Sequence, residues 1–251
     1  MRGPGYALLM FATVAALPAR ADCEKDGLSL FPAPGAIVPT NTRFILEGFG
    51  KDQGAVSGLV GQSLTLSAEG DTVSVKVQKG WRSAMNQVAV LLRPSRTLKP
   101  NLDYTLKLPT ALAELTLTNA MPTRGPVWRT GRTGDTRSPA WEERPTVSEG
   151  EYIFKERELT RHIKLRMTLQ EDSPSFLLLT MRRLRGAVGI QTYFVPINGG
   201  EAQIGHDGCH GSFGFEDGGA YRAKVEVFDS AGNTTRQQAE VEFLAPAPAA
   251  Q

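Results

Sequence analysis

The residues best suited to chemistry gather in one stretch late in the chain, IGHDGCHGSFGFEDGG, which runs from position 204 to 219. It holds two of the three histidines and one of the two cysteines of the protein. Imidazole and thiolate groups bind zinc and copper, so His206, Cys209 and His210 are candidate metal ligands. Their spacing matches neither a C-x-x-C pair nor an H-E-x-x-H ligand set.

A disulfide is the simpler role for Cys209, because the other cysteine of the chain is Cys23. An even number of cysteines in an exported chain predicts a pair. The glycines around Cys209 allow this loop to turn, so that its thiol can reach Cys23. We therefore expect a Cys23–Cys209 disulfide, with a free thiol and metal binding as the alternatives.

A catalytic role for this loop is not expected. Nucleophilic catalysis needs a Cys or Ser beside an oriented histidine, and such groups usually come from separate segments. Cys209, His210 and Asp207 are near neighbours in the sequence, and adjacent side chains of an extended segment point apart. Glu216 and Asp217 precede a glycine, which is typical of a polar turn. We predict no catalytic residues, no cofactor and no enzymatic activity.

Two other groups of side chains are candidate partner-binding residues. In KGWRSAMNQ, positions 79 to 87, an indole stands beside hydrogen-bonding side chains, a combination suited to sugar contact or to a protein interface. In MRRLRG, positions 181 to 186, three arginines could meet an acidic partner. The alternatives are a tryptophan folded over a sandwich edge and a solvated strand end. The residues concerned are Trp81, Arg82, Asn86, Arg182, Arg183 and Arg185.

Residues 1–21 have the pattern of a cleaved secretory signal peptide. A basic residue precedes an apolar run at 7–17, and Ala19-Arg20-Ala21 places small residues before the cleavage point. The run is shorter than the ~20 residues that span a bilayer. Asp22, in place of a small residue, precedes Cys23, which argues against lipidation. We expect a mature chain without a membrane span, exported to the periplasm, the cell surface or the extracellular space.

The charge balance disfavours two classes of partner. The chain carries 28 basic and 26 acidic residues, and cleavage after position 21 removes Arg2 and Arg20, which leaves 26 of each sign. A formally neutral chain has no general electrostatic attraction for nucleic acid or for an anionic membrane. We therefore expect neither as a partner.

Alternating apolar residues predict an all-β fold. Segments such as TVSVKV, DYTLKL, RHIKLRMTL and AYRAKVEVFD place apolar side chains on one face and polar ones on the other. Turn signals separate these segments at the spacing of a β-sandwich. We expect sandwiches at 22–122 and 140–245, a linker-like stretch at 123–139 and a loose Ala/Pro tail at 246–251. Asp229 and Asn233 fall short of a calcium loop and are explained by a hairpin turn.

Three motifs resemble the strands of known β-sandwich families. FPAPGAIVPTNTRFIL, positions 31 to 46, is similar to the opening strand of bacterial Ig-like domains, and LKPNLDYTLKL, positions 98 to 108, to their closing pattern. GGAYRAKVEVFDSAGN, positions 218 to 233, resembles the last hairpin of Ig-like and fibronectin type III modules, with Tyr221 at the place of a tyrosine corner. The resemblance implies two tandem Ig-like antiparallel β-sandwiches. Such folds host many functions, so no ligand follows from it.

These features predict a non-enzymatic exported module that binds a partner or serves as a structural part of a bacterial cell envelope. The expected partner is an envelope protein or polysaccharide. Copper-handling periplasmic proteins include domains with a similar opening strand, so copper or zinc binding is the alternative function. The chain departs from them by lacking a histidine at the mature N-terminus and a methionine-rich loop. A hydrolase is the second alternative.

The disulfide can be tested by intact mass spectrometry after alkylation. The mature protein is expected to take up no alkyl group without reductant and one on each of its two cysteines after reduction. Two alkylated thiols in the unreduced protein would contradict the disulfide.

Overall fold

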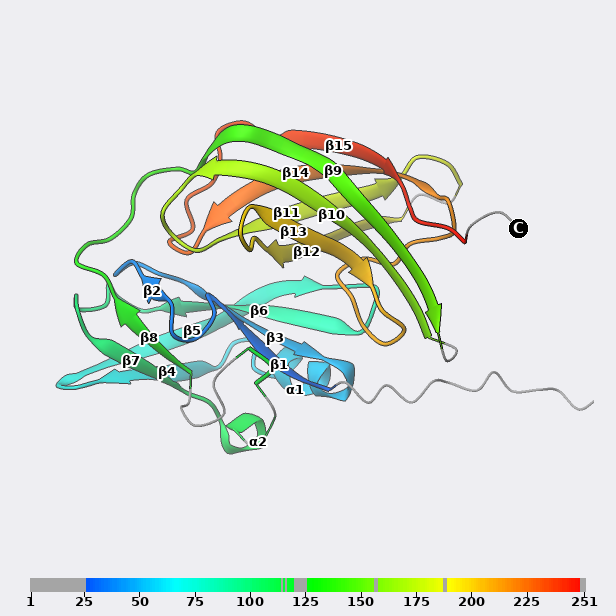
Figure 1. The fold of residues 1–251 in the computed structure, drawn as a ribbon. Coiled ribbons are helices and arrows are strands. Elements are labelled where there is room, and N and C mark those ends of the chain that lie inside the picture. The colour runs from blue at the N-terminus through cyan, green and yellow to red at the C-terminus, as the bar shows by residue number, and fades with distance from the viewer. Residues whose placement is uncertain are drawn as a thin grey trace, which may run out of the picture.

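A computed structural model describes residues 26–113, 115, 117–119, 126–155, 158–186 and 189–248. These residues form two β-rich units, which lie one above the other in Figure 1. Unit 1 contains strands β1 to β8, and unit 2 contains strands β9 to β15. The all-β fold class predicted from the sequence is confirmed. None of the helices in the described part of the chain has the length and apolar character that a membrane crossing requires.

Unit 1 is built from one continuous sheet. Its elements are β1 (Gly27–Phe31), β2 (Ile37–Val38), β3 (Phe44–Phe49), the 3-10 turn η1 (Gly50–Asp52), α1 (Gln53–Ser57), β4 (Ser63–Ala68), β5 (Asp71–Arg82), β6 (Gln87–Pro94), β7 (Asp103–Lys107), α2 (Thr110–Ala113) and β8 (Val127–Thr130). The strand order is β1-β3-β6-β5-β4-β7-β8-β2. The edge strands β1 and β2 are separated only by residues 32–36, so the sheet curls until its edges approach and enclose a core.

The core of unit 1 consists of the inward-facing residues of these strands. The residues that period-two spacing places inward are buried, namely Leu64, Leu66, Val73, Val75, Val77, Val88, Val90, Leu92, Tyr104 and Leu106. Trp128 is also fully buried, with its ring centroid 4.5 Å from that of Phe44. β8 therefore belongs to unit 1, although the sequence suggested a linker there. The alternation in VWRT is short and is flanked by Gly, Thr and Arg, so it does not stand out in the sequence. The segment between the units is 131–139.

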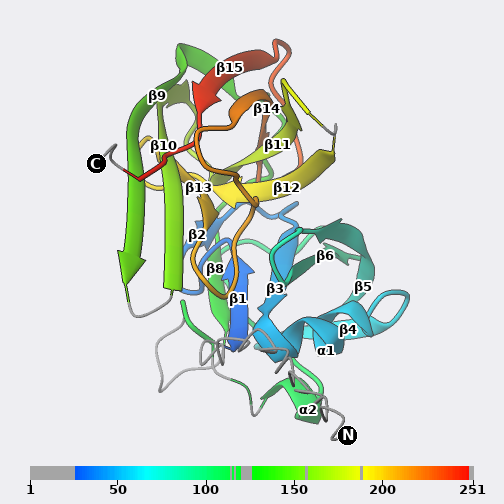
Figure 2. The same cartoon turned by 90° about the vertical axis from the view of Figure 1, so that its right-hand side faces the viewer.

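Unit 2 is a sandwich of two antiparallel sheets. Its strands are β9 (Ala140–Lys155), β10 (Glu158–Gln170), β11 (Ser175–Arg183), β12 (Ile190–Pro196), β13 (Glu201–His206), β14 (Ala220–Asp229) and β15 (Ala239–Leu244). One sheet has the order β13-β10-β9 and the other the order β12-β11-β14-β15. The predicted inward residues are buried between them: Ile163, Leu165, Met167, Tyr221, Ala223, Val225, Val227, Ala239, Val241 and Phe243. The distal part of the β9–β10 hairpin reaches beyond the other strands of the unit (Figures 1 and 2).

An apolar interface joins the two units. Phe31, Ile45 and Ala89 of unit 1 are buried in the same cluster as the core of unit 2. The ring centroid of Phe176, on β11, lies 5.3 Å from that of Phe31 and 6.1 Å from that of Trp81. These side chains project from the outer faces of their sheets, because their strand neighbours point into the two sandwich cores. The two units are thus packed against each other along β1-β3-β6-β5 and β12-β11-β14-β15.

A half-buried carboxylate adds a polar contact to this interface. Glu47, on β3, accepts hydrogen bonds from the hydroxyl of Tyr193 in unit 2 at 2.6 Å and from that of Ser29 in unit 1 at 2.8 Å. Burial raises the pKa of Glu47, although both hydrogen bonds act in the opposite direction. A carboxylate that accepts hydrogen bonds from both units favours one position of the units over shifted ones.

Each unit has a hydrogen-bonded tyrosine at the start of a strand. In unit 2, the hydroxyl of Tyr221 accepts a hydrogen bond from the N–H of Glu216 at 3.0 Å. In unit 1, the hydroxyl of Tyr104 accepts one from the N–H of Lys99 at 3.0 Å. Both donors lie five residues upstream of the tyrosine, so each bond ties a loop to the strand that follows it.

Replacing Tyr221 with phenylalanine is expected to lower the free energy of unfolding by about 1 kcal/mol, because the Glu216 N–H loses its acceptor while the ring stays packed. This corresponds to a fall in Tm of about 2–4 °C, measurable by thermal unfolding. Tyr152→Phe is the matched control, since among the described residues the Tyr152 hydroxyl makes no hydrogen bond. Equal effects of the two substitutions would show that the hydrogen bond between Glu216 and Tyr221 contributes nothing to stability.

Candidate functional site

The histidine- and cysteine-bearing loop lies against unit 1. The side chain of Asn86 donates a hydrogen bond from Nδ2 to the carbonyl of Cys209 at 3.3 Å. The ring of His210 lies over that of Phe49, the last residue of β3, with a centroid distance of 5.0 Å. The loop at 204–219 therefore takes part in holding the two units together.

Asp207 organises the turn inside this loop. Its Oδ1 accepts hydrogen bonds from the N–H groups of Cys209 at 2.9 Å and His210 at 2.8 Å, and lies 2.8 Å from Nδ1 of His210. Burial alone would raise the pKa of Asp207, but these hydrogen bonds outweigh it and hold the pKa well below its ordinary value.

The donor atoms of His206, Cys209 and His210 do not gather into a group of ligands. Within the described ranges, the three potential ligand atoms that lie within 4.8 Å of one another belong to Asp135, Glu171 and Asp229. Copper or zinc binding by the three loop residues stays a prediction. The Cys23–Cys209 disulfide stays one too, because Cys23 lies outside the described residues.

The first candidate partner-binding group lies at the junction of the units. The ring centroid of Trp81 is 5.8 Å from that of Phe194 in unit 2, so the indole anchors an interface within the chain. Asn86 is engaged with the 204–219 loop. Arg82 is exposed and donates a hydrogen bond to Oε1 of Gln53 at 3.2 Å. A role of these residues toward an outside partner stays a prediction.

The three arginines of the second group have different surroundings. Arg183 is half-buried, and its Nη1 lies 2.6 Å from Oε2 of Glu216. Arg182 and Arg185 are exposed and have no ion pair among the described residues. Strand alternation explains this difference, because Arg182 and Arg183 are neighbours on β11 and point to opposite faces. The sequence alone does not show which of the three arginines forms an ion pair within the chain.

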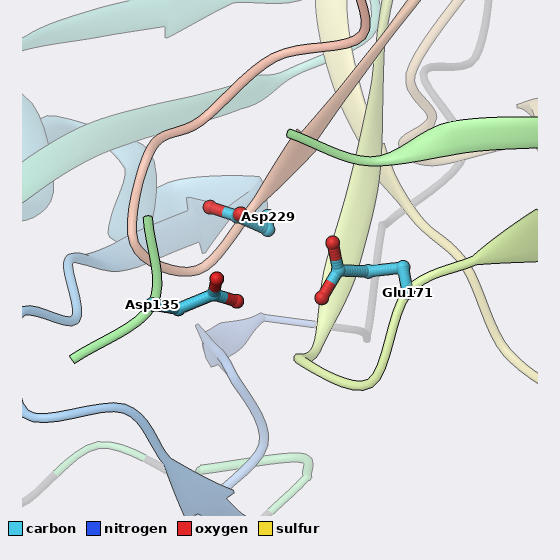
Figure 3. Close-up of side chains that lie close together, drawn as sticks. All are labelled: Asp135, Glu171 and Asp229. Carbon is cyan, nitrogen blue, oxygen red and sulfur yellow. The ribbon is translucent and has the colours of Figure 1, made fainter. Parts of the chain in front are cut away.

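The set of donor atoms that the structure does bring together is acidic. Asp135 lies in the segment between the units, Glu171 follows β10, and Asp229 ends β14. One carboxylate oxygen of each lies within 4.8 Å of the other two. Figure 3 shows the three side chains converging from separate segments. Asp229 is almost completely buried, while Asp135 and Glu171 are half-buried.

Amide groups hold the acidic cluster in place. The side chain of Asn233 donates from Nδ2 to Asp229 at 2.7 Å and to the carbonyl of Asp135 at 3.2 Å. The same carbonyl accepts a hydrogen bond from Nδ2 of Asn41 in unit 1 at 2.7 Å. The N–H of Ser173 donates to Glu171 at 2.7 Å. Asp229 and Asn233 thus form the expected hairpin turn and also position the segment between the units.

The cluster concentrates negative charge. Burial raises the pKa of Glu171 and of Asp229, and the nearby carboxylate of Asp135 raises both further. Carboxylate and carbonyl oxygens are ligands that suit hard cations such as Ca²⁺ or Mg²⁺, in contrast to the soft donors of the histidine loop. Of this group, only Asp229 stands out in the sequence, beside Asn233 in a hairpin turn. Asp135 and Glu171 lie in distant segments, so only folding brings the three carboxylates together.

Glu171→Gln is expected to increase the free energy of unfolding at pH 7 by about 0.5 kcal/mol in the presence of a chelator, because it removes a like charge and keeps the acceptor for Ser173. A carboxyl whose folded-state pKa is raised stabilises the fold most when protonated, and this contribution is lost as the pH rises through that pKa. The difference between variant and wild type should therefore vanish below the ordinary glutamate value of 4.5.

Urea unfolding at several pH values measures this difference. Glu69→Gln, in an exposed turn of unit 1, is the matched control for the loss of a carboxylate charge. A lower stability of Glu171→Gln at pH 7 would contradict the repulsion. Repeating the series with calcium in place of the chelator shows whether a bound cation makes Glu171→Gln less stable than the wild type.

No protein-family model matches this chain, and no curated protein sequence is significantly similar to it.

Proposed function

We propose that the chain is an exported, non-enzymatic binding or structural module of a bacterial cell envelope, built from two Ig-like β-sandwiches. The observation that carries this proposal is the apolar interface in which Phe31, Ile45 and Ala89 join the core of unit 2. It couples the two sandwiches, so that their outer surfaces keep fixed relative positions. A rigid pair of sandwiches is suited to a structural protein that binds other envelope components through surfaces held at fixed positions.

The strand orders support the Ig-like assignment of both units. In unit 1, β1-β3-β6-β5 followed by β4-β7-β8 corresponds to the ABED and CFG sheets of an immunoglobulin-type sandwich. In unit 2, β9-β10-β13 opposite β12-β11-β14-β15 corresponds to the three-on-four arrangement of a fibronectin type III-like module. Tyr104 and Tyr221 both stand at the start of the strand that corresponds to F, where a tyrosine corner belongs.

Export is supported by the signal-peptide pattern of residues 1–21 and by the surroundings of Cys209. Gly27 pairs with Phe49, whose ring lies against His210, the residue after Cys209. Cys23 is four residues before Gly27, and an extended chain of that length spans up to about 14 Å. The start of β1 is therefore close enough to the loop for the proposed Cys23–Cys209 disulfide, which suits an oxidising compartment.

The proposal is tested by producing the full chain in a Gram-negative host and following its processing and location. We expect a product whose intact mass begins at Asp22, found outside the cytoplasm and sedimenting with envelope fragments without detergent. Ala19→Asp should block cleavage, because the position three residues before the cleavage point needs a small side chain. Arg20→Lys is the matched control and should be processed normally.

Two results would contradict the proposal. One is an unprocessed chain retained in the cytoplasm. The other is hydrolysis of generic ester, peptide or glycoside substrates by the purified protein, lost when Cys209 or Asp207 is replaced.

A further inference from the structure

The outer face of the sheet β12-β11-β14-β15 is divided into a covered and an open part. At one end, Phe176, Phe194 and Trp81 form the interface with unit 1. At the other end, the same face continues without cover from the described residues.

The open end combines exposed aliphatic side chains with arginine. Ile190 and Leu244 are 69% and 68% exposed, and Leu184 is also exposed. Arg182 lies between Ile190 on β12 and Arg222 on β14, directly opposite each. Ala220 pairs with Leu244, and its carbonyl accepts a hydrogen bond from the N–H of Leu184. We call this surface the arginine–aliphatic face; its members are Leu184, Ile190, Leu244, Arg182 and Arg185.

Two arginines of this face favour an acidic partner. Arg222 is already paired with Glu242 on β15. Arg182 and Arg185 have no ion pair within the part of the chain that the structure describes. Exposed aliphatic groups beside arginine are typical of protein interfaces, in which arginine is enriched. The complementary surface should therefore carry carboxylates next to apolar groups.

The distal part of the β9–β10 hairpin is such a surface. Ile153 is 44% exposed and pairs with Thr160 of β10, on the same face of the hairpin as Glu149 and Glu151. Glu149 and Glu151 alternate with Ile153 on this face of β9. Glu149 lies 2.7 Å from Nζ of Lys164 and Glu151 lies 3.7 Å from Nδ1 of His162, but both carboxylates stay more than half exposed, so these pairs contribute little. β9 is also an edge strand, since the sheet order ends with it. The hairpin belongs to the opposite sheet of the sandwich, so it cannot fold onto the arginine–aliphatic face of its own unit.

We propose that the β9–β10 hairpin of one copy docks on the arginine–aliphatic face of a second copy. This inference deepens the proposed function and rests on it, because it names the partner of the structural module as another copy of the chain. The two contacting surfaces differ, so the contact is heterologous and can extend from copy to copy. The charge pairing lies at exposed positions, and salt therefore weakens it.

Sedimentation velocity of the purified mature protein tests the proposal. The weight-average sedimentation coefficient is expected to rise between about 1 µM and about 300 µM protein, the range of a weak specific interface. The rise should shrink when the salt concentration increases from about 0.05 M to about 0.5 M. Arg182→Glu on one surface and Glu151→Arg on the other should each weaken association at least ~10-fold, a loss of about 1.4 kcal/mol.

Matched controls separate this contact from general charge effects and from misfolding. Arg132→Glu makes the same charge change at an exposed position of the segment between the units and should associate like the wild type. Ile190→Ser and Ile153→Ser test the apolar part without any charge change. All these side chains are exposed, so Tm should stay unchanged.

The decisive sample is a mixture of the Arg182→Glu and Glu151→Arg variants. Each retains one intact surface, so the mixture should form heterodimers although neither variant associates alone. A protein that stays monomeric over the whole range, or association that both variants leave unchanged, would overturn the proposal. Either result leaves the exported module standing, because processing and envelope location are measured on separate samples.

Discussion

The contact between the outer faces of two sheets is the constraint on which the rest of this structure depends. An outer sheet face normally meets water, yet here it carries Phe31, Ile45 and Phe176, each of which is buried. Covering such a side chain stabilises a fold by about 1.5–3 kcal/mol, so each unit stabilises the other by covering this face. The half-buried carboxylate of Glu47 accepts one of its two hydrogen bonds from Tyr193 of the other unit.

The same contact explains how the remaining candidate sites are distributed. It brings the 204–219 loop against Phe49 and Asn86, which leaves this loop a role in joining the units. On the far side, it brings Asn41 of unit 1 to the carbonyl of Asp135, beside the acidic cluster. The part of the sheet that unit 1 does not cover is left as the arginine–aliphatic face. The position of one unit on the other therefore determines the surroundings of the 204–219 loop, of the acidic cluster and of the arginine–aliphatic face.

The sequence predicted the strands well because burial in a sandwich imposes a period of two, which survives in segments such as RHIKLRMTL and TVSVKV. The place of Tyr221 came from a resemblance of GGAYRAKVEVFDSAGN to the last hairpin of known sandwich modules, and its hydroxyl does accept a backbone hydrogen bond from Glu216. The sequence did not predict that β8 belongs to unit 1, because four residues are too few to show alternation. Nor did it predict the acidic cluster or the partners of Trp81, since contacts between distant segments depend on how two complete sheets pack, and periodicity carries no information about that.

Hydrogen exchange measured by mass spectrometry over a series of denaturant concentrations tests the coupling of the units most directly. If the interface makes them one cooperative body, the slowest amides of β3 and β6 and those of β11 and β14 open with the same free energy. The account would be contradicted if the slowest amides of one unit opened at a free energy at least about 2 kcal/mol lower, while those of the other unit stayed protected.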